Sequence, residues 1–344
     1  MELTEIYRPI RSALQASETL LLRELSLKDG FGHSLLGEMT RHVARMSGKR
    51  IRPALALLGA GVARAAHPGR ANGSGEGIPS SAVRLATAVE MIHTATLLHD
   101  DVIDGASLRR GISTLNAKWG DTLSVLSGDY LYSKAFCLLG ELNSQTVLHL
   151  MSDTARIVCE GEVAQIQHQY DLTLTRASYL KIIRWKTASL MGASAQGGAL
   201  LGGATSAQAA RLGAFGLNFG LAFQILDDTQ DLLGEEEVLG KSLGTDLALG
   251  QLTLPFLYLR DSAEPELRST LSQWFNGNGS RSAAQAREQL RFLKGQAIKY
   301  QVPTYCARVA NRYLNLARNS LAPFPGSPYK TSLLALTDYL SIEK

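Results

Sequence analysis

Cysteine and net charge are both scarce in this sequence, and each scarcity excludes a class of protein. The 344 residues contain three cysteines, Cys137, Cys159 and Cys306. Their odd number and wide spacing argue against a disulfide framework and favour a reducing compartment such as the cytoplasm. The formal net charge is only +4, and no stretch interleaves basic with aromatic residues. A nucleic-acid partner is therefore not expected.

Targeting signals and long apolar runs are lacking too. The first five residues are acidic and precede no apolar core, so they do not read as a signal peptide. No uninterrupted apolar run reaches the about 18 residues of a typical membrane helix. Residues 188–204 come nearest, but they include Ser189, Ser194 and Gln196 among many small residues. Such residues favour a closely packed buried helix, so the sequence predicts a soluble chain without a transmembrane segment.

Apolar residues are abundant, and they recur with the 3.6-residue period of helices. Hydrophobic residues make up 45% of the chain and charged residues 19%, which suffices for a large core. Alternating β-branched runs, the usual sign of strands, are almost lacking. Helix breaks are expected at residue 48 and over 67–80, 105–120, 234–250 and 275–282. We expect residues 1–344 to form a single all-α domain of about ten helices or more.

One acidic pattern occurs twice within apolar surroundings. Its aspartates are Asp100, Asp101 and Asp104 in the first cluster, and Asp227, Asp228 and Asp231 in the second. At about 100° per residue, the three side chains of a cluster fall at roughly 0°, 100° and 40°, on one helical face. Two unit charges about 4 Å apart repel by about 4 kcal/mol at an effective dielectric of about 20. A solvated acidic helix end explains one such cluster, but two with the same spacing predict a bound cation.

The carboxylate ligands indicate which cation is bound, and a basic segment over residues 49–52 indicates what kind of substrate binds. Carboxylate oxygens without cysteines suit Mg²⁺, which usually shares its coordination shell with substrate phosphates. Lys49, Arg50 and Arg52 precede Pro53, a residue that suits the first turn of a helix. Cations are unfavourable at a helix N-terminus unless an anion binds there. The segment therefore predicts a phosphate site, with a solvated basic loop as the alternative.

Three further cations each admit two interpretations. Arg109 and Arg110 follow the first acidic cluster, where they either pair with its aspartates or bind phosphate through their guanidinium forks. Lys186 interrupts an apolar segment, where it either extends toward solvent or reaches a diphosphate. The sequence alone leaves these alternatives open.

Three other sites fit the sequence less well. Gly240-Lys241-Ser242 departs from a P-loop by one residue of spacing and follows no predicted strand. Glu90 and His93 match one Glu-x-x-His unit of a di-iron bundle, but no second unit exists in the sequence. His99 beside Asp100 resembles the dyad of helical metal phosphohydrolases, but that function leaves the second acidic cluster without a role.

The motifs, in their order along the chain, resemble those of the trans (all-E) isoprenyl diphosphate synthases. They are Gly48-Lys49-Arg50-x-Arg52-Pro53, Leu98-His99-Asp100-Asp101-x-x-Asp104, Arg109-Arg110-Gly111, Gly128-Asp129-Tyr130-Leu131, Gly161-Glu162, Lys186-Thr187, Phe223-Gln224-x-x-Asp227-Asp228-x-x-Asp231 and Gly240-Lys241-x-x-Gly244-x-Asp246. The likeness covers nearly the whole chain, and so many ordered motifs make it specific.

The resemblance implies a helical bundle of the isoprenoid synthase type around a deep central cavity, with the two acidic clusters facing each other across its mouth. It implies a homodimer that condenses isopentenyl diphosphate with an allylic diphosphate, assisted by three Mg²⁺ ions. Asp100, Asp104 and Asp227 would bind the ions, and Asp101, Asp228 and Asp231 would support them. The other implied roles are contact with the allylic diphosphate for Arg109, Lys186 and Lys241, contact with isopentenyl diphosphate for Lys49, Arg52, His93 and Arg110, and oxygen atoms facing the carbocation for Thr187 and Gln224.

Three positions depart from the family pattern. Gln251 stands where the family has a lysine, Gln230 where it usually has an apolar residue, and Lys330 where it often has an arginine. These departures bear on rate and affinity rather than on the class of reaction.

Residues one turn before the first acidic cluster bear on product length. Thr96 precedes Asp100 by about one helical turn and should line the cavity beneath the aspartate face. Short-chain family members have bulky aromatic residues here and at the preceding position, whereas this chain has Ala95 and Thr96, with Ile92 below. We therefore predict a polyprenyl product of C30 or longer. A farnesyl or geranylgeranyl diphosphate synthase and a non-catalytic partner subunit are the alternatives.

Overall fold

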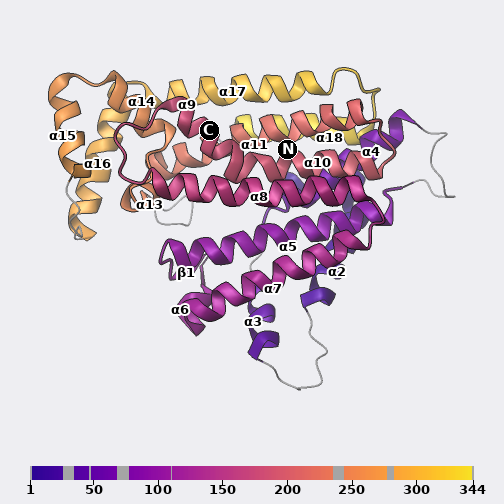
Figure 1. The fold of residues 1–344 in the computed structure, drawn as a ribbon. Helices are drawn as coiled ribbons and strands as arrows, with labels where there is room; N and C mark the ends of the chain where they lie inside the picture. The colour runs from indigo at the N-terminus through magenta and orange to yellow at the C-terminus, as the bar shows by residue number, and fades with distance from the viewer. Residues whose placement is uncertain are drawn as a thin grey trace. The chain divides into compact units, whose positions relative to one another are not determined.

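Helices make up nearly all of the regular structure in the computed structural model, which describes residues 2–25, 35–45, 48–67, 77–109, 111–234, 244–276 and 283–342 (Figure 1). The elements are α1 (Leu3–Ile6), η1 (Arg8–Ile10), α2 (Arg11–Leu25), α3 (Leu35–Ala44), α4 (Ile51–Ala66), α5 (Ser80–Ile103), β1 (Leu108–Arg109), β2 (Ile112–Ser113), α6 (Leu115–Trp119), α7 (Asp121–Gly140), α8 (Gln145–Gln167), α9 (Arg176–Ile183), η2 (Arg184–Ala188), α10 (Ser189–Leu201), α11 (Ser206–Leu233), α13 (Thr245–Ala248), α14 (Leu254–Ser262), α15 (Pro265–Asn276), α16 (Ala283–Lys299), α17 (Val302–Ser320) and α18 (Pro328–Ile342). The predicted all-α class is confirmed.

The predicted break over 105–120 contains three elements that helical periodicity did not reveal. Strands β1 and β2 form an antiparallel hairpin in which Leu108 pairs with Ser113 and Arg109 with Ile112. Two residues per strand are too few to show an alternating pattern, which explains why the sequence did not predict them. Gly111 has a φ of 75° in the turn, a conformation that glycine adopts without steric cost. Helix α6 follows directly and is only five residues long.

Two compact units divide the chain. The first comprises Met1–Ala155, Leu190–Gly216 and Ala317–Lys344, and the second comprises Arg156–Ser189 and Leu217–Leu316. Their four boundaries fall within helices α8, α10, α11 and α17 rather than within linkers. The prediction of one domain over residues 1–344 stays a prediction.

In the first unit, α4 and α10 pack closely because α10 is rich in small residues. All α4 residues from Pro53 to Ala63 are buried. A Cβ atom on Gly198 would collide with the carbonyl oxygen of Ala56, and one on Gly202 would lie 2.5 Å from that of Ala60. Glycine at these two positions therefore allows the close approach of the two backbones. The interpretation of residues 188–204 as a buried helix is confirmed for α10.

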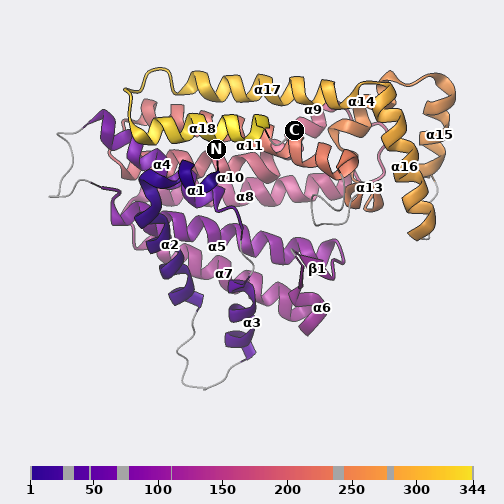
Figure 2. The same ribbon diagram turned by 180° about the vertical axis from the view of Figure 1, so that it is seen from behind.

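Helix α5 is the central element of the first unit. It packs along α7 over much of its length, as both ribbon views show (Figures 1 and 2), and it also contacts α2 and α4. Leu85, Val89 and Ile92 are completely buried in these interfaces. The same helix ends at Ile103, so its packing fixes the position of the first acidic cluster at its C-terminal end.

Among the described residues, α11 alone has the length and apolar composition of a membrane span. Its most apolar 18-residue window has a mean hydropathy of 1.3, and 56% of that window is buried in the protein. A core helix passes the same test, so this observation is only weak support for a span.

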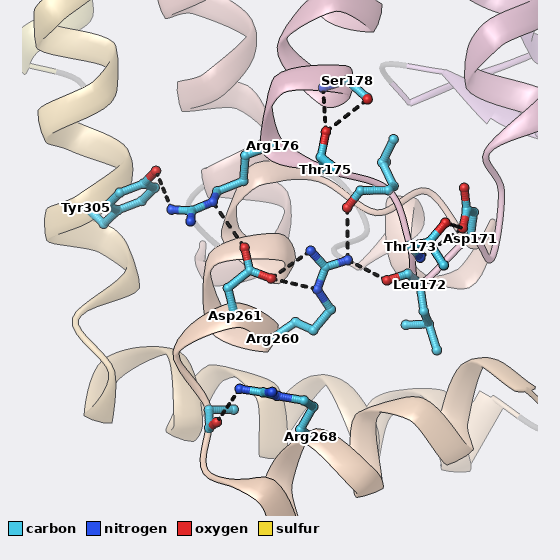
Figure 3. A network of polar contacts seen from close by, with 12 residues as sticks. Asp171, Leu172, Thr173, Thr175, Arg176, Ser178, Arg260, Asp261, Arg268 and Tyr305 are labelled. Carbon is cyan, nitrogen blue, oxygen red and sulfur yellow. Dashed lines mark hydrogen bonds and ion pairs between the residues drawn. The ribbon is translucent and has the colours of Figure 1, made fainter.

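In the second unit, a network of charged side chains holds the segment that leads into α9 (Figure 3). Arg260 Nη1 donates hydrogen bonds to the carbonyl oxygens of Leu172 (2.7 Å) and Leu174 (2.9 Å). Arg260 also pairs with Asp261, which in turn accepts a contact of 3.1 Å from Arg176 Nε at the start of α9. The network therefore fixes the beginning of α9, the helix that leads to Lys186 and Thr187.

Candidate active site

The first acidic cluster lies at the C-terminal end of α5. Asp100 and Asp101 are in the last turn, and Asp104 follows the helix with φ −84° and ψ −6°. The C-terminus of a helix carries partial negative charge, so three carboxylates there are unfavourable without a cation. Asp100 and Asp104 are half-buried, whereas Asp101 is completely buried. The donor set therefore suits a hard divalent ion reached through Asp100 and Asp104.

Asp101 is paired with Arg109, one of the cations that the sequence left with two interpretations. Arg109 Nε donates to Asp101 Oδ1 at 2.7 Å. Burial raises the pKa of Asp101, and the Arg109 guanidinium offsets part of that rise. Asn116 holds the loop in place, because its Nδ2 atom donates to the carbonyl oxygens of Asp101 (3.2 Å) and Ala106 (3.0 Å). The salt-bridge interpretation of Arg109 thus holds for its Nε atom in this structure.

His99 packs against α7, and its ring contacts residues of that helix. Its Nε2 atom is 3.2 Å from the carbonyl oxygen of Val125 and 3.4 Å from Asp129 Oδ1. A Cβ atom on Gly128 would collide with the His99 ring, so the glycine makes room for it. This packing role explains His99 and argues against the phosphohydrolase alternative.

Two of the predicted isopentenyl diphosphate residues, Lys49 and Arg52, lie around the start of α4 in the first unit. Arg52 Nη1 is 3.0 Å from His93 Nε2. The Tyr7 hydroxyl donates to the carbonyl oxygen of Lys49 at 2.9 Å, and Lys49 Nζ lies 5.4 Å from the centre of the Tyr339 ring. Helix α4 begins at Ile51, so Pro53 lies in its first turn as predicted. The structure thus brings Arg52 and His93 together, and Lys49 lies three residues before Arg52 in the sequence.

The second acidic cluster lies near the end of α11 in the second unit. Both carboxylate oxygens of Asp228 accept hydrogen bonds, from the Tyr179 hydroxyl at 2.5 Å and from Gln224 Nε2 at 2.6 Å. The Thr187 hydroxyl donates to Gln224 Oε1 at 2.9 Å. Burial raises the pKa of Asp228 to about 7 against the effect of its two donors, and the nearby Asp227 carboxylate adds to the rise. Thr187 and Gln224 are therefore held as a fixed pair.

The last aspartate of this cluster holds a neighbouring turn. Asp231 Oδ1 accepts from the Thr245 hydroxyl at 2.9 Å, and Oδ2 accepts from the Asp246 backbone at 3.2 Å. The second bond satisfies a backbone N–H in the first turn of α13, as an N-capping residue does. Asp227, by contrast, is half-buried. Within each cluster, then, the carboxylates differ in burial: Asp100, Asp104 and Asp227 are more exposed than Asp101, Asp228 and Asp231.

Lys186 lies on a single π-helical turn, η2. Such turns occur frequently at functional sites, because they shift the side chains that follow. Lys186 Nζ is 2.5 Å from Glu162 Oε2 on α8. A Cβ atom on Gly161 would lie 2.5 Å from the backbone nitrogen of Lys186, so glycine is needed for this close approach. The Lys186 ammonium is thereby held by a carboxylate instead of extending into solvent.

Two residues without a predicted role take part in these networks. Tyr179 lies seven residues, about two helical turns, before Lys186. This spacing, which places both residues on one helical face, was the signal in the sequence that could have identified Tyr179. Glu162 was part of a recognised motif, but no role was given to it.

Arg110 and Lys241 lie outside the described residues. Within the described part of the chain, no three His, Cys, Asp or Glu side chains converge as a ready metal site.

The residues predicted to set product length lie on the buried part of α5. Ala95 and Ile92 are completely buried, and Thr96 is half-buried with its hydroxyl donating to the carbonyl oxygen of His93 at 2.7 Å. A cavity of about 230 Å³ in the first unit is lined by residues of α2, α3, α5 and α7, among them Glu18, Met91 and Leu131. It includes neither acidic cluster, so it is not the predicted central cavity, which stays a prediction.

Replacing Tyr179 with Phe is expected to destabilise the metal-free protein by about 1–3 kcal/mol, because a buried Asp228 oxygen loses its donor. The folded protein binds a proton at Asp228 that the unfolded chain has released at neutral pH, so the stability from this group falls as pH rises from about 4 to about 7. Loss of the hydroxyl raises the pKa of Asp228 further. The loss in free energy of unfolding of Tyr179→Phe, relative to wild type, should therefore grow as pH rises through 7. It is measured by urea unfolding in the presence of a chelator.

The matched control for this prediction is Tyr170→Phe. The Tyr170 hydroxyl makes an exposed hydrogen bond of 3.3 Å to the carbonyl oxygen of Ala248. Removal of the Tyr170 hydroxyl should change the free energy of unfolding little at any pH. An equal deficit of Tyr179→Phe at pH 5 and pH 8 would contradict the role given to its hydroxyl.

Comparisons with known proteins identify relatives of this chain. A sequence model described as polyprenyl synthetase matches residues 33–293. The octaprenyl diphosphate synthase of Haemophilus influenzae is 35% identical over 310 residues, 90% of this chain and 88% of that one. The all-trans-nonaprenyl-diphosphate synthase (geranyl-diphosphate specific) of Rhodobacter capsulatus is 32% identical over 333 residues, covering 97% and 95% of the two chains.

A solved structure shows the same fold. The polyprenyl synthase of Caulobacter crescentus complexed with calcium and isoprenyl diphosphate has a TM-score of 0.88 at 33% identity, covering 99% of this chain and 97% of that one. The family resemblance, the helical isoprenoid synthase fold and the enzyme class predicted from the sequence are confirmed, and the family uses a divalent metal ion. This chain, with its two acidic clusters and its basic segment, belongs to the polyprenyl synthetase family of prenyl-transferring enzymes.

Proposed function

We propose that this chain is an all-E prenyltransferase that condenses isopentenyl diphosphate with an allylic diphosphate to give a polyprenyl diphosphate of C30 or longer. The presence of both complete acidic clusters in a chain of this family supports the proposal most directly. A non-catalytic partner subunit has no need of either cluster. The named relatives that make octaprenyl and nonaprenyl products favour the longer lengths over a farnesyl or geranylgeranyl product.

In the proposed site, the two acidic clusters face a common diphosphate. Asp100, Asp104 and Asp227 would hold three Mg²⁺ ions, which supply positive charge to the departing diphosphate. The remaining aspartates support this arrangement without binding the ions directly, since their oxygens already accept protein hydrogen bonds; they are Asp101, Asp228 and Asp231. The cations that contact the allylic diphosphate directly are Arg109, Lys186 and Lys241.

The chain's own residues then orient the second substrate and protect the cation. Lys49, Arg52, His93 and Arg110 bind isopentenyl diphosphate. When the allylic C1–O bond breaks, the isopentenyl double bond attacks C1, and the released diphosphate accepts the proton lost from the new chain. The Thr187 and Gln224 oxygens lie side by side at 2.9 Å and stabilise the positive charge as it develops. Apolar walls exclude the water that would otherwise quench the cation.

An activity assay on the purified chain tests the proposed function. With isopentenyl and farnesyl diphosphates and Mg²⁺, we expect the chain alone to form products of C30 or longer, identified by mass analysis. Products that stop at C15 or C20 would favour a short-chain synthase. No condensation without a second protein would favour the partner-subunit alternative and would overturn the proposal.

We also propose that the enzyme is a homodimer in the cytoplasm and that its contact surface includes α7. Val125 and Leu126 on this helix are 39% and 55% exposed, which leaves two adjacent large apolar side chains uncovered in the single chain. Contiguous exposed apolar groups mark interaction surfaces, whereas a single exposed apolar side chain is ordinary, so the adjacent pair is the better candidate.

Replacing Leu126 with Asp should therefore convert the dimer into a monomer, as measured by light scattering during size-exclusion chromatography, because a charge in the interface would be desolvated without a partner. Ile298→Asp, at a position that is 71% exposed on α16, should leave the mass unchanged. A dimer that persists in Leu126→Asp would contradict a contact through this part of α7.

A further inference from the structure

Arg50 stands between two residues proposed to bind isopentenyl diphosphate, yet the structure gives its side chain different partners. It is the last residue before α4 and has a left-handed backbone, with φ 52° and ψ 32°. Residues other than glycine rarely adopt this conformation, and those that do are usually held by the surrounding structure. The contacts that hold Arg50 therefore also determine how Lys49 and Arg52 are presented.

Two glutamates hold the Arg50 guanidinium. Its Nη1 atom is 2.5 Å from Glu90 Oε1, and its Nε atom is 3.2 Å from Glu18 Oε1. Arg50 and Glu90 are largely buried, with side chains 17% and 8% exposed, whereas Glu18 is 45% exposed. Burial by itself would lower the pKa of Arg50, but Glu90 and Glu18 outweigh it, so the net shift is upward and the cation persists. A planar guanidinium with several donors is suited to bridging two carboxylates in this way.

Helix α5 connects this ion cluster with the proposed substrate residues. Glu90 and His93 are three residues apart on α5, on the same face and less than one turn from each other. Glu90 pairs with Arg50, and His93 lies 3.0 Å from Arg52. One helical face thus contacts both arginines of the basic segment.

Glu90 would be harmful at this place without Arg50. A largely buried carboxylate less than one turn from His93 would repel a diphosphate bound by His93 and Arg52. Pairing with the Arg50 cation cancels that charge and satisfies a Glu90 oxygen. Arg50 therefore has two effects on the neighbouring anion site, one through the backbone and one through charge.

We infer that Arg50 is a positioning residue for isopentenyl diphosphate: through its ion pairs with Glu90 and Glu18 it fixes the left-handed turn that presents Lys49 and Arg52, and it neutralises Glu90 beside His93. It acts without touching the substrate. This inference rests on the proposed function.

A double-mutant cycle tests the inference, with Arg50→Lys, Glu90→Gln and the double variant compared in steady-state assays. Lysine keeps the charge of Arg50 but not the fork that bridges two carboxylates. We expect each single change to raise the KM for isopentenyl diphosphate about tenfold, with the KM for farnesyl diphosphate within about twofold of wild type. The double variant should be about as impaired as the worse single one, because both changes break the same pair. Direct contact between Arg50 and substrate predicts instead about a hundredfold for the double variant.

The matched control is Arg84→Lys, which alters the exposed ion pair of Glu141 with Arg84, six residues before Glu90 on α5. Its two KM values should not change. Should Glu90→Gln fail to fold, Glu18→Gln provides the same test from the exposed side of the cluster, with an expected rise of about threefold in the KM for isopentenyl diphosphate alone.

Several results would overturn the inference: unchanged KM values in Arg50→Lys, additive effects in the double variant, or equal shifts in both KM values, which a general loss of structure would produce. An unchanged KM in Glu18→Gln would overturn the role of that glutamate and with it the bridged cluster. Failure of the proposed function looks different, because the wild-type chain would then not condense the two substrates at all.

Discussion

Replacing Asp100 with Asn will lower kcat about a thousandfold while leaving the fold intact. The change removes one of the accessible carboxylates proposed to hold divalent ions at the departing diphosphate, and loss of a single electrostatic group in a transition state costs about a hundred- to a thousandfold. Asn has the same shape as Asp, and Asp100 is only half-buried, so packing should be preserved. The rate is measured with saturating Mg²⁺, isopentenyl diphosphate and farnesyl diphosphate.

Two comparisons make the result specific. Asp153→Asn, on the exposed part of α8, removes the same charge away from the site and should leave kcat unchanged. His99→Ala should also be much less harmful than Asp100→Asn, since His99 packs against α7. A phosphohydrolase-like site would reverse this order, with His99→Ala inactive and Asp231→Ala nearly normal.

Replacing Thr96 with Phe will shorten the product from C30 or longer to C15–C20. Thr96 lies about one turn before Asp100 on α5, so an aromatic ring there should close the path of the growing chain. Each isoprene unit that enters an apolar path gains on the order of 4 kcal/mol, at about 0.8 kcal/mol per carbon, which drives elongation until the path ends. Products are resolved by thin-layer chromatography and mass analysis.

Thr96→Val is the control, since valine has nearly the same volume as threonine. It removes only the hydroxyl that donates to the His93 carbonyl oxygen at 2.7 Å, so its products should remain long. An unchanged product ladder from Thr96→Phe would show that this position does not line the path.

The acidic clusters and the helices that carry them were predictable, because helical periodicity depends only on positions along the chain. The spacing of Asp100, Asp101 and Asp104 predicted a helix there, and α5 carries the first two in its last turn, with Asp104 directly after its end. The sequence also located the basic segment at the start of α4, where Pro53 lies in the first turn. Family motifs then gave the class of reaction, which the relatives and the solved structure support.

Partners that are distant in the sequence could not be predicted in the same way. Arg50 is 40 residues from Glu90, and Tyr179 is 49 from Asp228, so neither pair leaves a local pattern. The π-helical turn at Lys186 was also missed, because a single wide turn barely disturbs a 3.6-residue period. The pairing of Arg109 Nε with Asp101 depends on a loop conformation that Asn116 holds, and Asn116 belongs to no motif. Tertiary contacts determine these features.

A crystal structure of the protein with Mg²⁺ and a non-hydrolysable allylic diphosphate analogue tests the central claim most directly. The account predicts metal ions coordinated by Asp100 and Asp104 on one side and by Asp227 on the other, with the analogue's diphosphate bound between them. Ions held by a single cluster, or two clusters that open onto separate surfaces without a shared ligand, would contradict it.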